Sequence, residues 1–101
     1  MHMVFTSIFP PGKATEVAGA SIKARETPLP PFIREVIVLA KTGGEQGIVV
    51  LTIYEAEDDK VPEAAKELAK RIADNYYAIE GYRYQMDLML TREETLPLLG
   101  L

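Results

Sequence analysis

Cysteine is entirely absent from this chain of 101 residues. Its absence excludes disulfide scaffolds, thiolate zinc sites, thiol nucleophiles and iron–sulfur clusters held by cysteine. Histidine is almost as scarce, because His2 is the only one. A catalytic triad built on Ser7 is therefore excluded, since no histidine follows Met3 to activate that hydroxyl. We expect neither a cofactor nor a metal ion to be bound.

Clustered basic charge is also missing. The chain has 11 Lys and Arg against 15 Asp and Glu, a formal charge of -4, and Lys70-Arg71 is its only adjacent basic pair. Binding to a phosphate backbone needs a concentrated basic surface. We therefore expect no nucleic-acid partner.

Long hydrophobic runs are absent as well. The longest strongly apolar stretches are Val36–Ala40 and Ile48–Leu51, far shorter than the roughly 20 residues that cross a bilayer. The N-terminus has no basic segment followed by an apolar segment, so it does not resemble a secretory signal. We expect no membrane association and a cytoplasmic location.

Apolar residues make up 48% of the chain and charged residues 26%, which is typical of a folded globular domain. Two domains would each be too small for a sufficient core. We therefore expect a single domain over residues 1–101, with residues 91–101 as a C-terminal extension.

The first half of the chain predicts a strand, a helix and a hairpin. Val4–Phe9 is rich in β-branched and aromatic residues and ends at a proline pair, which favours a strand. Over Lys13–Arg25, small and apolar residues recur at helical spacing. Glu35–Lys41 and Gly47–Tyr54 favour strands, and Gly43-Gly44 between them supplies the positive φ of a tight reversal. The predicted apolar stripe of the helix consists of Ala14, Val17, Ala18, Ser21, Ile22 and Arg25.

The second half predicts a helix, a strand and a short helical turn. Apolar residues at three-and-four spacing from Val61 to Ile79 predict an amphipathic helix, with Asp58 or Asp59 as its N-cap. Tyr82–Leu90 alternates as a half-buried strand does, and its apolar face should meet the helices. Thr91-Arg92-Glu93-Glu94 fits a capping box.

The predicted order is βαββαβ, which favours an α+β, ferredoxin-like fold: a four-stranded antiparallel sheet with two helices on one face. Two helices cover only one face of a sheet. The predicted hairpin strands nevertheless carry apolar residues at both odd and even positions, and therefore on both faces, at Val36–Ala40 and Ile48–Leu51. A continuous apolar run indicates that both faces are buried. We expect a second copy of the chain to cover the other face, with the C-terminal leucines as a possible clamp.

From Val4 to Leu101 the chain resembles the small dimeric α+β-barrel proteins, in which two ferredoxin-like protomers pack sheet to sheet. The resemblance depends on the element order, the Pro10-Pro11-Gly12 turn, the two-sided hairpin and the Gly81-Tyr82 entry to the last strand. Members include cofactor-independent monooxygenases, haem-degrading enzymes, lactone isomerases, effector-binding regulator domains and uncharacterised proteins. The haem-degrading members hold iron through a histidine, which argues against that activity here.

Five residues are candidates for a ligand site. Arg83, Gln85 and Asp87 lie on the face of the last predicted strand that is turned away from the helices, at steps of roughly 7 Å. They could orient a carboxylate or enol ligand, or they could form ion pairs at a dimer rim. Tyr54, like Tyr76, Tyr77, Tyr82 and Tyr84, could bind or protonate a small aromatic or quinone-like molecule, or fill a core edge. Lys13 could receive an anion at the start of a helix, or merely follow a turn.

The sequence therefore leaves three functions open. These are binding of a small organic ligand by a homodimer, catalysis by a cofactor-independent monooxygenase- or isomerase-like enzyme, and a structural or interaction role without catalysis.

Overall fold

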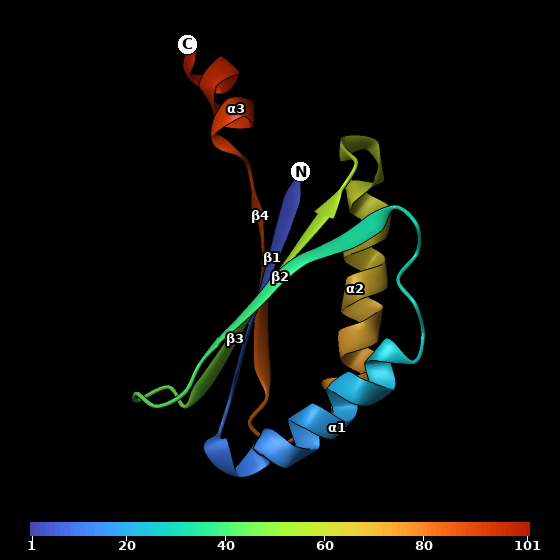
Figure 1. Cartoon of the computed structure of the whole chain (residues 1–101), viewed down its shortest axis with the longest axis vertical. Helices are drawn as coiled ribbons and strands as arrows, with labels where there is room; N and C mark the ends of the chain where they lie inside the picture. The colour runs from blue at the N-terminus through green and yellow to red at the C-terminus, as the bar shows by residue number, and fades with distance from the viewer.

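Four strands form one antiparallel sheet in the order β2-β3-β1-β4 (Figure 1). The computed structural model describes all residues 1–101. Along the chain the elements follow the predicted order β1-α1-β2-β3-α2-β4, and two short helical segments come after β4. The fold is thus α+β. The strands are β1 (His2–Phe9), β2 (Ile33–Lys41), β3 (Ile48–Ala56) and β4 (Arg83–Met89).

Two helices, α1 (Ala14–Arg25) and α2 (Val61–Tyr76), lie on the same side of the sheet (Figure 1). Short 3-10 turns precede them at Pro11–Lys13 and Asp58–Lys60. The predicted aspartate N-cap of α2 is wrong, because Lys60 stands at that position and makes no side-chain cap. The Asp58 carboxylate instead lies 3.0 Å from the N-terminal ammonium of Met1.

The hydrophobic core lies between the sheet and α2. The helix contributes Val61, Ala64 and Leu68, which pack on Met3 and Phe5 of β1. No residue of α1 is buried. Burying apolar side chains is the main source of stability in a domain of this size, so α2 anchors the fold and α1 covers the sheet more loosely.

The predicted apolar stripe of α1 is wrong at Ile22. This side chain is 68% exposed, while Val17, Ser21 and Ala24 face the sheet. Successive residues of a helix are rotated by about 100°. A stripe centred on Ser21 therefore turns Ile22 toward solvent.

The apolar side of β4 is much less covered than the sequence predicts. Tyr84, Met86 and Leu88 point to the same side as the helices, yet all three are exposed, Leu88 by 53%. β4 is an edge strand, and none of its residues belongs to the core. Sequence alternation gave the correct face, but it did not reveal that the two helices leave this edge uncovered.

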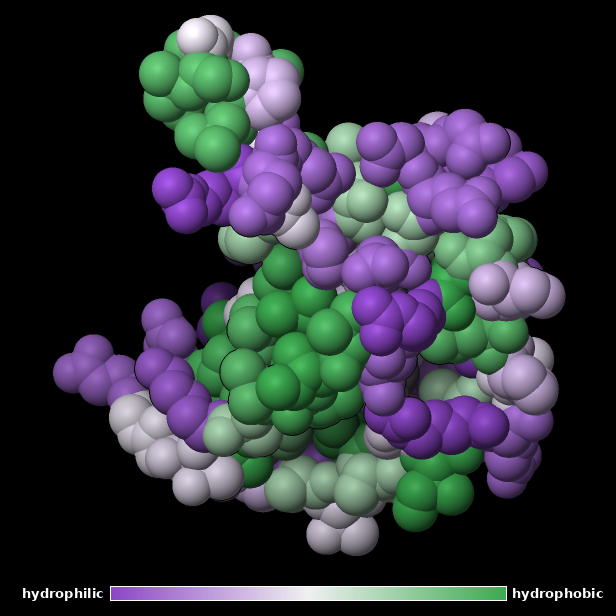
Figure 2. Space-filling model, turned by 45° about the horizontal axis from the view of Figure 1, so that its top comes forward, coloured by the Kyte–Doolittle hydropathy of each residue, from purple (hydrophilic) through white to green (hydrophobic).

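The face of the sheet opposite the helices is apolar at its centre. A bulge between Glu35 and Ile37 shifts the alternation of β2, so that Ile37 and Leu39 pair with Ile53 and Leu51 on this open face. Ile37 is exposed, and Leu39 is 50% exposed. Figure 2 shows a broad hydrophobic area in the middle of the molecule, with the C-terminal segment standing apart above it.

The C-terminal residues form α3 (Arg92–Thr95) and a 3-10 turn at Leu96–Leu99. The predicted capping box is confirmed: the Glu94 amide donates to Thr91 Oγ1 at 3.1 Å, and the Thr91 amide donates to Glu94 Oε1 at 2.9 Å. This segment extends beyond the end of β4 (Figure 1), and Leu101 is 81% exposed. It therefore leaves the β2 side of the open face uncovered, where Leu39 is exposed, whereas Val4 of β1 on the same face is buried. No helix has the length and apolar character needed to cross a bilayer.

Candidate functional site

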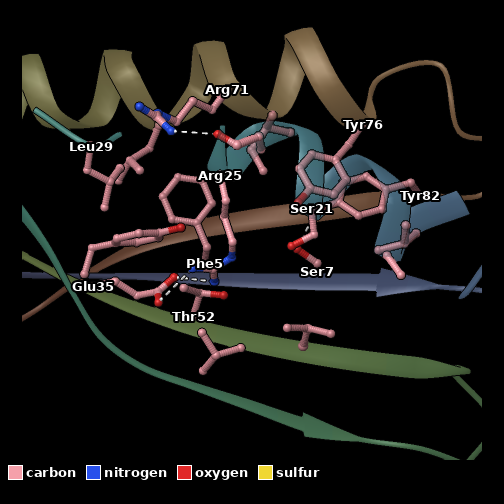
Figure 3. A pocket seen from close by; sticks show the side chains of 18 of the residues that line it. Phe5, Ser7, Ser21, Arg25, Leu29, Glu35, Thr52, Arg71, Tyr76 and Tyr82 are labelled. Carbon is pink, nitrogen blue, oxygen red and sulfur yellow. Dashed lines mark hydrogen bonds and ion pairs between the residues drawn. The ribbon is translucent and has the colours of Figure 1, made fainter. Parts of the chain in front are cut away.

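A cavity of about 490 Å³ lies between the two helices and the sheet (Figure 3). Its walls come from β1, β2, β3, α1, α2, the connection between α1 and β2, and Tyr82 just before β4. Of its 22 lining residues, 14 are hydrophobic. Both the volume and the mostly apolar lining are typical of small-molecule sites, which occupy roughly 300–1,000 Å³.

Small side chains on α1 leave this space open. The helix faces the cavity with Ala14, Val17, Ala18, Ser21 and Ala24. Protein interiors are otherwise closely packed, and short side chains do not reach across to the sheet. The small side chains at helical spacing over residues 13–25 therefore leave the space that forms the cavity.

Aromatic rings and two hydroxyl groups form one end of the cavity. Tyr82 stacks on Tyr76 with ring centroids 4.9 Å apart, and on Phe9 at 6.2 Å. Ser7 Oγ and the Tyr82 hydroxyl are 2.7 Å apart and share a hydrogen bond. Burial raises the pKa of Tyr82 to about 12, although the hydrogen bond from Ser7 opposes the shift. This phenol thus remains protonated at neutral pH and able to donate.

Tyr54 lines the cavity closer to its other end. Its ring meets Phe5 edge to face, with centroids 5.8 Å apart. Burial, reinforced by the nearby Glu35 carboxylate, raises the pKa of Tyr54 to about 12. Tyr54 is therefore a second neutral phenol in the cavity.

Arg25 and Glu35 form a two-point ion pair at the wall of the cavity (Figure 3). Glu35 of β2 pairs with Tyr54 of β3 in the sheet. Arg25 Nη2 donates to Glu35 Oε1 at 2.8 Å, and Nη1 donates to Oε2 at 3.4 Å. The pair joins the last residue of α1 to β2. Because each charge has its partner at close range, the pair supplies polarity to the cavity with no net charge.

Arg71 of α2 holds the connection between α1 and β2. Its guanidinium donates to the carbonyls of Thr27 and Pro28, both at 2.6 Å, and of Ala24 at 3.2 Å. Its Nε lies 3.3 Å from the Glu67 carboxylate. The carbonyls at the end of α1 thus gain partners, and the connection is fixed over the cavity.

The structure separates the candidates that the sequence predicts. Tyr54 lines the cavity. The three candidates of β4 lie on the open face, where each pairs with a residue of β1. The pairs are Arg83 with Ile8, Gln85 with Thr6, and Asp87 with Val4. There, Gln85 Nε2 donates to Asp87 Oδ2 at 2.9 Å.

The fifth candidate, Lys13, pairs with Glu16 at 3.2 Å in an exposed position at the start of α1. The cavity therefore brings together three of the tyrosines, Tyr54, Tyr76 and Tyr82, with residues that the sequence does not single out.

Sequence reasoning missed Arg25, Glu35 and Arg71, because no motif connects them. One signal was available for Ser7: it shares the inward face of β1 with Phe5 and Phe9, so a small polar side chain interrupts an apolar face. A polar residue on the inward side of a strand is a sign of a partner or a site.

Aromatic faces, two protonated phenols and compensated ion pairs surround an apolar space. The only imidazole, His2, lies on the open face beside Glu55 at 3.3 Å. No group of three or more His, Asp or Glu side chains is placed to hold a metal ion.

Comparison with known proteins gives only distant structural likeness. No family model matches the chain, and no curated protein matches it. A crystal structure of a formyltetrahydrofolate deformylase from Pseudomonas putida KT2440 is similar with a TM-score of 0.44 and 13% identity, over 88% of this chain and 29% of that one. The de novo designed protein Foldit4 is similar with a TM-score of 0.39 and 8% identity, over 88% of this chain and 96% of that one. The chain thus spans less than a third of the length of the deformylase.

Proposed function

We propose that this protein is a homodimer that binds a small organic molecule in the cavity between its helices and its sheet. The single observation that carries the proposal is the cavity of about 490 Å³, of which 14 of 22 lining residues are hydrophobic. A space of this size with few polar groups stabilises a ligand by removing its apolar surface from water.

The open face of the sheet supports the dimer. Ile37 and Leu39 of β2 are exposed there, next to Leu51 and Ile53 of β3. An apolar strand face of this kind is stabilised by a second sheet. We propose that the second sheet belongs to another copy, in the ferredoxin-like, sheet-to-sheet arrangement of the dimeric α+β-barrel proteins.

The C-terminal segment fits the same arrangement. Its leucines, Leu98, Leu99 and Leu101, are exposed and stand clear of their own sheet. In the proposed dimer they extend toward the partner copy. Arg83, Gln85 and Asp87 then lie between the two sheets, as a second polar site in the barrel.

A second candidate is a cofactor-independent enzyme of the monooxygenase or isomerase kind. Its support is the pair of neutral phenols, Tyr54 and Tyr82, in a cavity lined mostly by hydrophobic residues. A fixed phenol stabilises charge that develops on a substrate oxygen. Turnover of a bound molecule distinguishes this enzyme from a protein that only binds. A purely structural role predicts neither binding nor turnover.

Native mass spectrometry of the purified protein, with Nile red as an added neutral probe, tests the proposal. We expect a dimer that binds the dye. Val17→Phe places a ring in the cavity and should abolish binding, whereas Ile22→Phe adds the same ring on the exposed side of α1 and should not. Equal binding by both variants, or a monomer without dye, would contradict the proposal.

A further inference from the structure

We propose that the cavity selects an uncharged, largely apolar molecule that carries a hydrogen-bond-accepting oxygen, and that the hydroxyl pair of Ser7 and Tyr82 binds this oxygen. The inference rests on the proposed function, because it specifies the ligand of the same cavity.

The hydroxyl pair has one proton to give. Ser7 Oγ and the Tyr82 hydroxyl lie 2.7 Å apart, and two hydroxyl groups carry two protons. One proton makes the shared hydrogen bond, and neither oxygen has another side-chain or backbone partner in the protein. The second proton is therefore free to donate to an acceptor in the cavity, which Ser7 and Tyr82 both line.

The surroundings of this pair suit a flat apolar body. The ring of Tyr82 is part of a stack with Tyr76 and Phe9, at 4.9 and 6.2 Å. Val17 and Ile72 line the same cavity. A carbonyl or ether oxygen that accepts from the hydroxyl pair thus belongs to a molecule whose remainder packs on apolar and aromatic surface.

The charges of the cavity argue against an ionised ligand. The Glu35 carboxylate neutralises the charge of the Arg25 guanidinium, with Oε1 and Nη2 2.8 Å apart. The Arg71 guanidinium donates to three carbonyls and pairs with the Glu67 carboxylate. A carboxylate entering the cavity would lose its hydration without gaining a free counter-charge, which is costly.

The backbone positions of Glu35 and Ser7 are also well separated along the sheet. Their positions along the sheet follow from β3, where Tyr54 pairs with Glu35 and Val50 pairs with Ser7. Four residues of strand separate these positions by roughly 13 Å. A ligand oxygen at Ser7 and Tyr82 therefore leaves the pair of Arg25 and Glu35 intact.

Three probes that share one ring system test the inference: naphthalene, acetylnaphthalene and naphthoate. For the wild type, we expect acetylnaphthalene to bind about tenfold more tightly than naphthalene, as one net hydrogen bond allows. Naphthoate should bind more weakly than naphthalene. Ser7→Ala and Tyr82→Phe each leave one hydroxyl proton that can donate to the ligand, so the double variant Ser7→Ala/Tyr82→Phe, which leaves none, should abolish the preference for acetylnaphthalene and leave naphthalene affinity unchanged. Tyr84→Phe removes a hydroxyl outside the cavity and should leave the preference intact.

The outcomes separate this inference from the proposed function. A preference for acetylnaphthalene that survives in the double variant Ser7→Ala/Tyr82→Phe would overturn the inference alone, and so would tightest binding of naphthoate. Absence of binding by all three probes would overturn the proposed function as well. The far-ultraviolet circular dichroism of each variant confirms that it is folded. If the double variant does not fold, a wild type that fails to prefer acetylnaphthalene over naphthalene still overturns the inference.

Discussion

The guanidinium of Arg71 and the carbonyl of Thr27 are joined by a hydrogen bond of 2.6 Å that links α2 to the end of α1 across 44 residues of sequence. Two further carbonyls, of Ala24 and Pro28, accept from the same guanidinium. One side chain thus fixes both the position of α1 relative to α2 and the connection that lines the cavity.

Removal of this guanidinium should destabilise the protein. Arg71→Ala leaves three carbonyls without their charged donor, and we expect a loss of about 3 kcal/mol in the free energy of unfolding. Arg71→Lys keeps the charge but not the fork of donors, so its loss should be smaller. Urea denaturation measures both. Amide hydrogen exchange over residues 26–32 should also accelerate in Arg71→Ala, and an unchanged exchange rate there would contradict this role.

Gly47 should tolerate alanine much less well than Gly43. Both residues have positive φ, at 90° and 85°. A Cβ on Gly47 would lie 2.7 Å from the carbonyl oxygen of Phe9, whereas one on Gly43 meets nothing within 4 Å. We expect Gly47→Ala to cost roughly 2–4 kcal/mol and Gly43→Ala about 1 kcal/mol. Equal losses of unfolding free energy in the two variants would show that the contact with Phe9 is unimportant.

Stability should fall in strongly alkaline solution. The pKa values of Tyr54 and Tyr82 are about 12 in the folded protein, above the ordinary value of 10.0. The folded state therefore holds these two protons to higher pH than the unfolded state does. Their contribution to stability is fully present below pH 10 and is lost as pH rises toward about 12.

Urea titrations across this pH range check the prediction. The double variant Tyr54→Phe/Tyr82→Phe should show a clearly shallower decline than the wild type, because it lacks both buried phenols. A decline of the same slope in the double variant would mean that other groups cause it.

The open face should control the oligomeric state. Leu39→Glu puts a charge on the apolar surface of β2, and we expect it to weaken the proposed dimer by roughly 30-fold or more. Ile22→Glu puts the same charge on the exposed side of α1 and should leave the dimer intact. Sedimentation equilibrium of both variants decides between these results. Dissociation of both variants to the same extent would show that the open face is not the dimer interface.

Local chemistry made much of the fold predictable. The proline pair after Phe9 ends β1, the paired glycines allow the hairpin, and Thr91 with Glu94 forms the capping box. Each of these features depends on residues close together in sequence. Helical spacing likewise identified α2, whose buried Leu68 lies on the predicted stripe.

The site was less predictable because it depends on how elements meet. Arg71 bonds to residues more than 40 positions away, and no periodicity in either segment indicates that contact. The cavity arises from the size of side chains on α1 relative to their distance from the sheet. The exposure of Leu88 likewise follows from where the helices lie over the sheet, which alternation along one strand does not encode.

Chemical-shift mapping by NMR tests the binding claim most directly, with isotope-labelled protein titrated with acetylnaphthalene. We predict saturable shifts of the methyl groups of Val17, Leu29 and Ile72, which line the cavity. The methyl groups of Leu39 and Leu51 on the open face serve as the internal reference and should not respond. Shifts confined to those two leucines, or no saturable shift at any methyl group, would contradict a ligand site between the helices and the sheet.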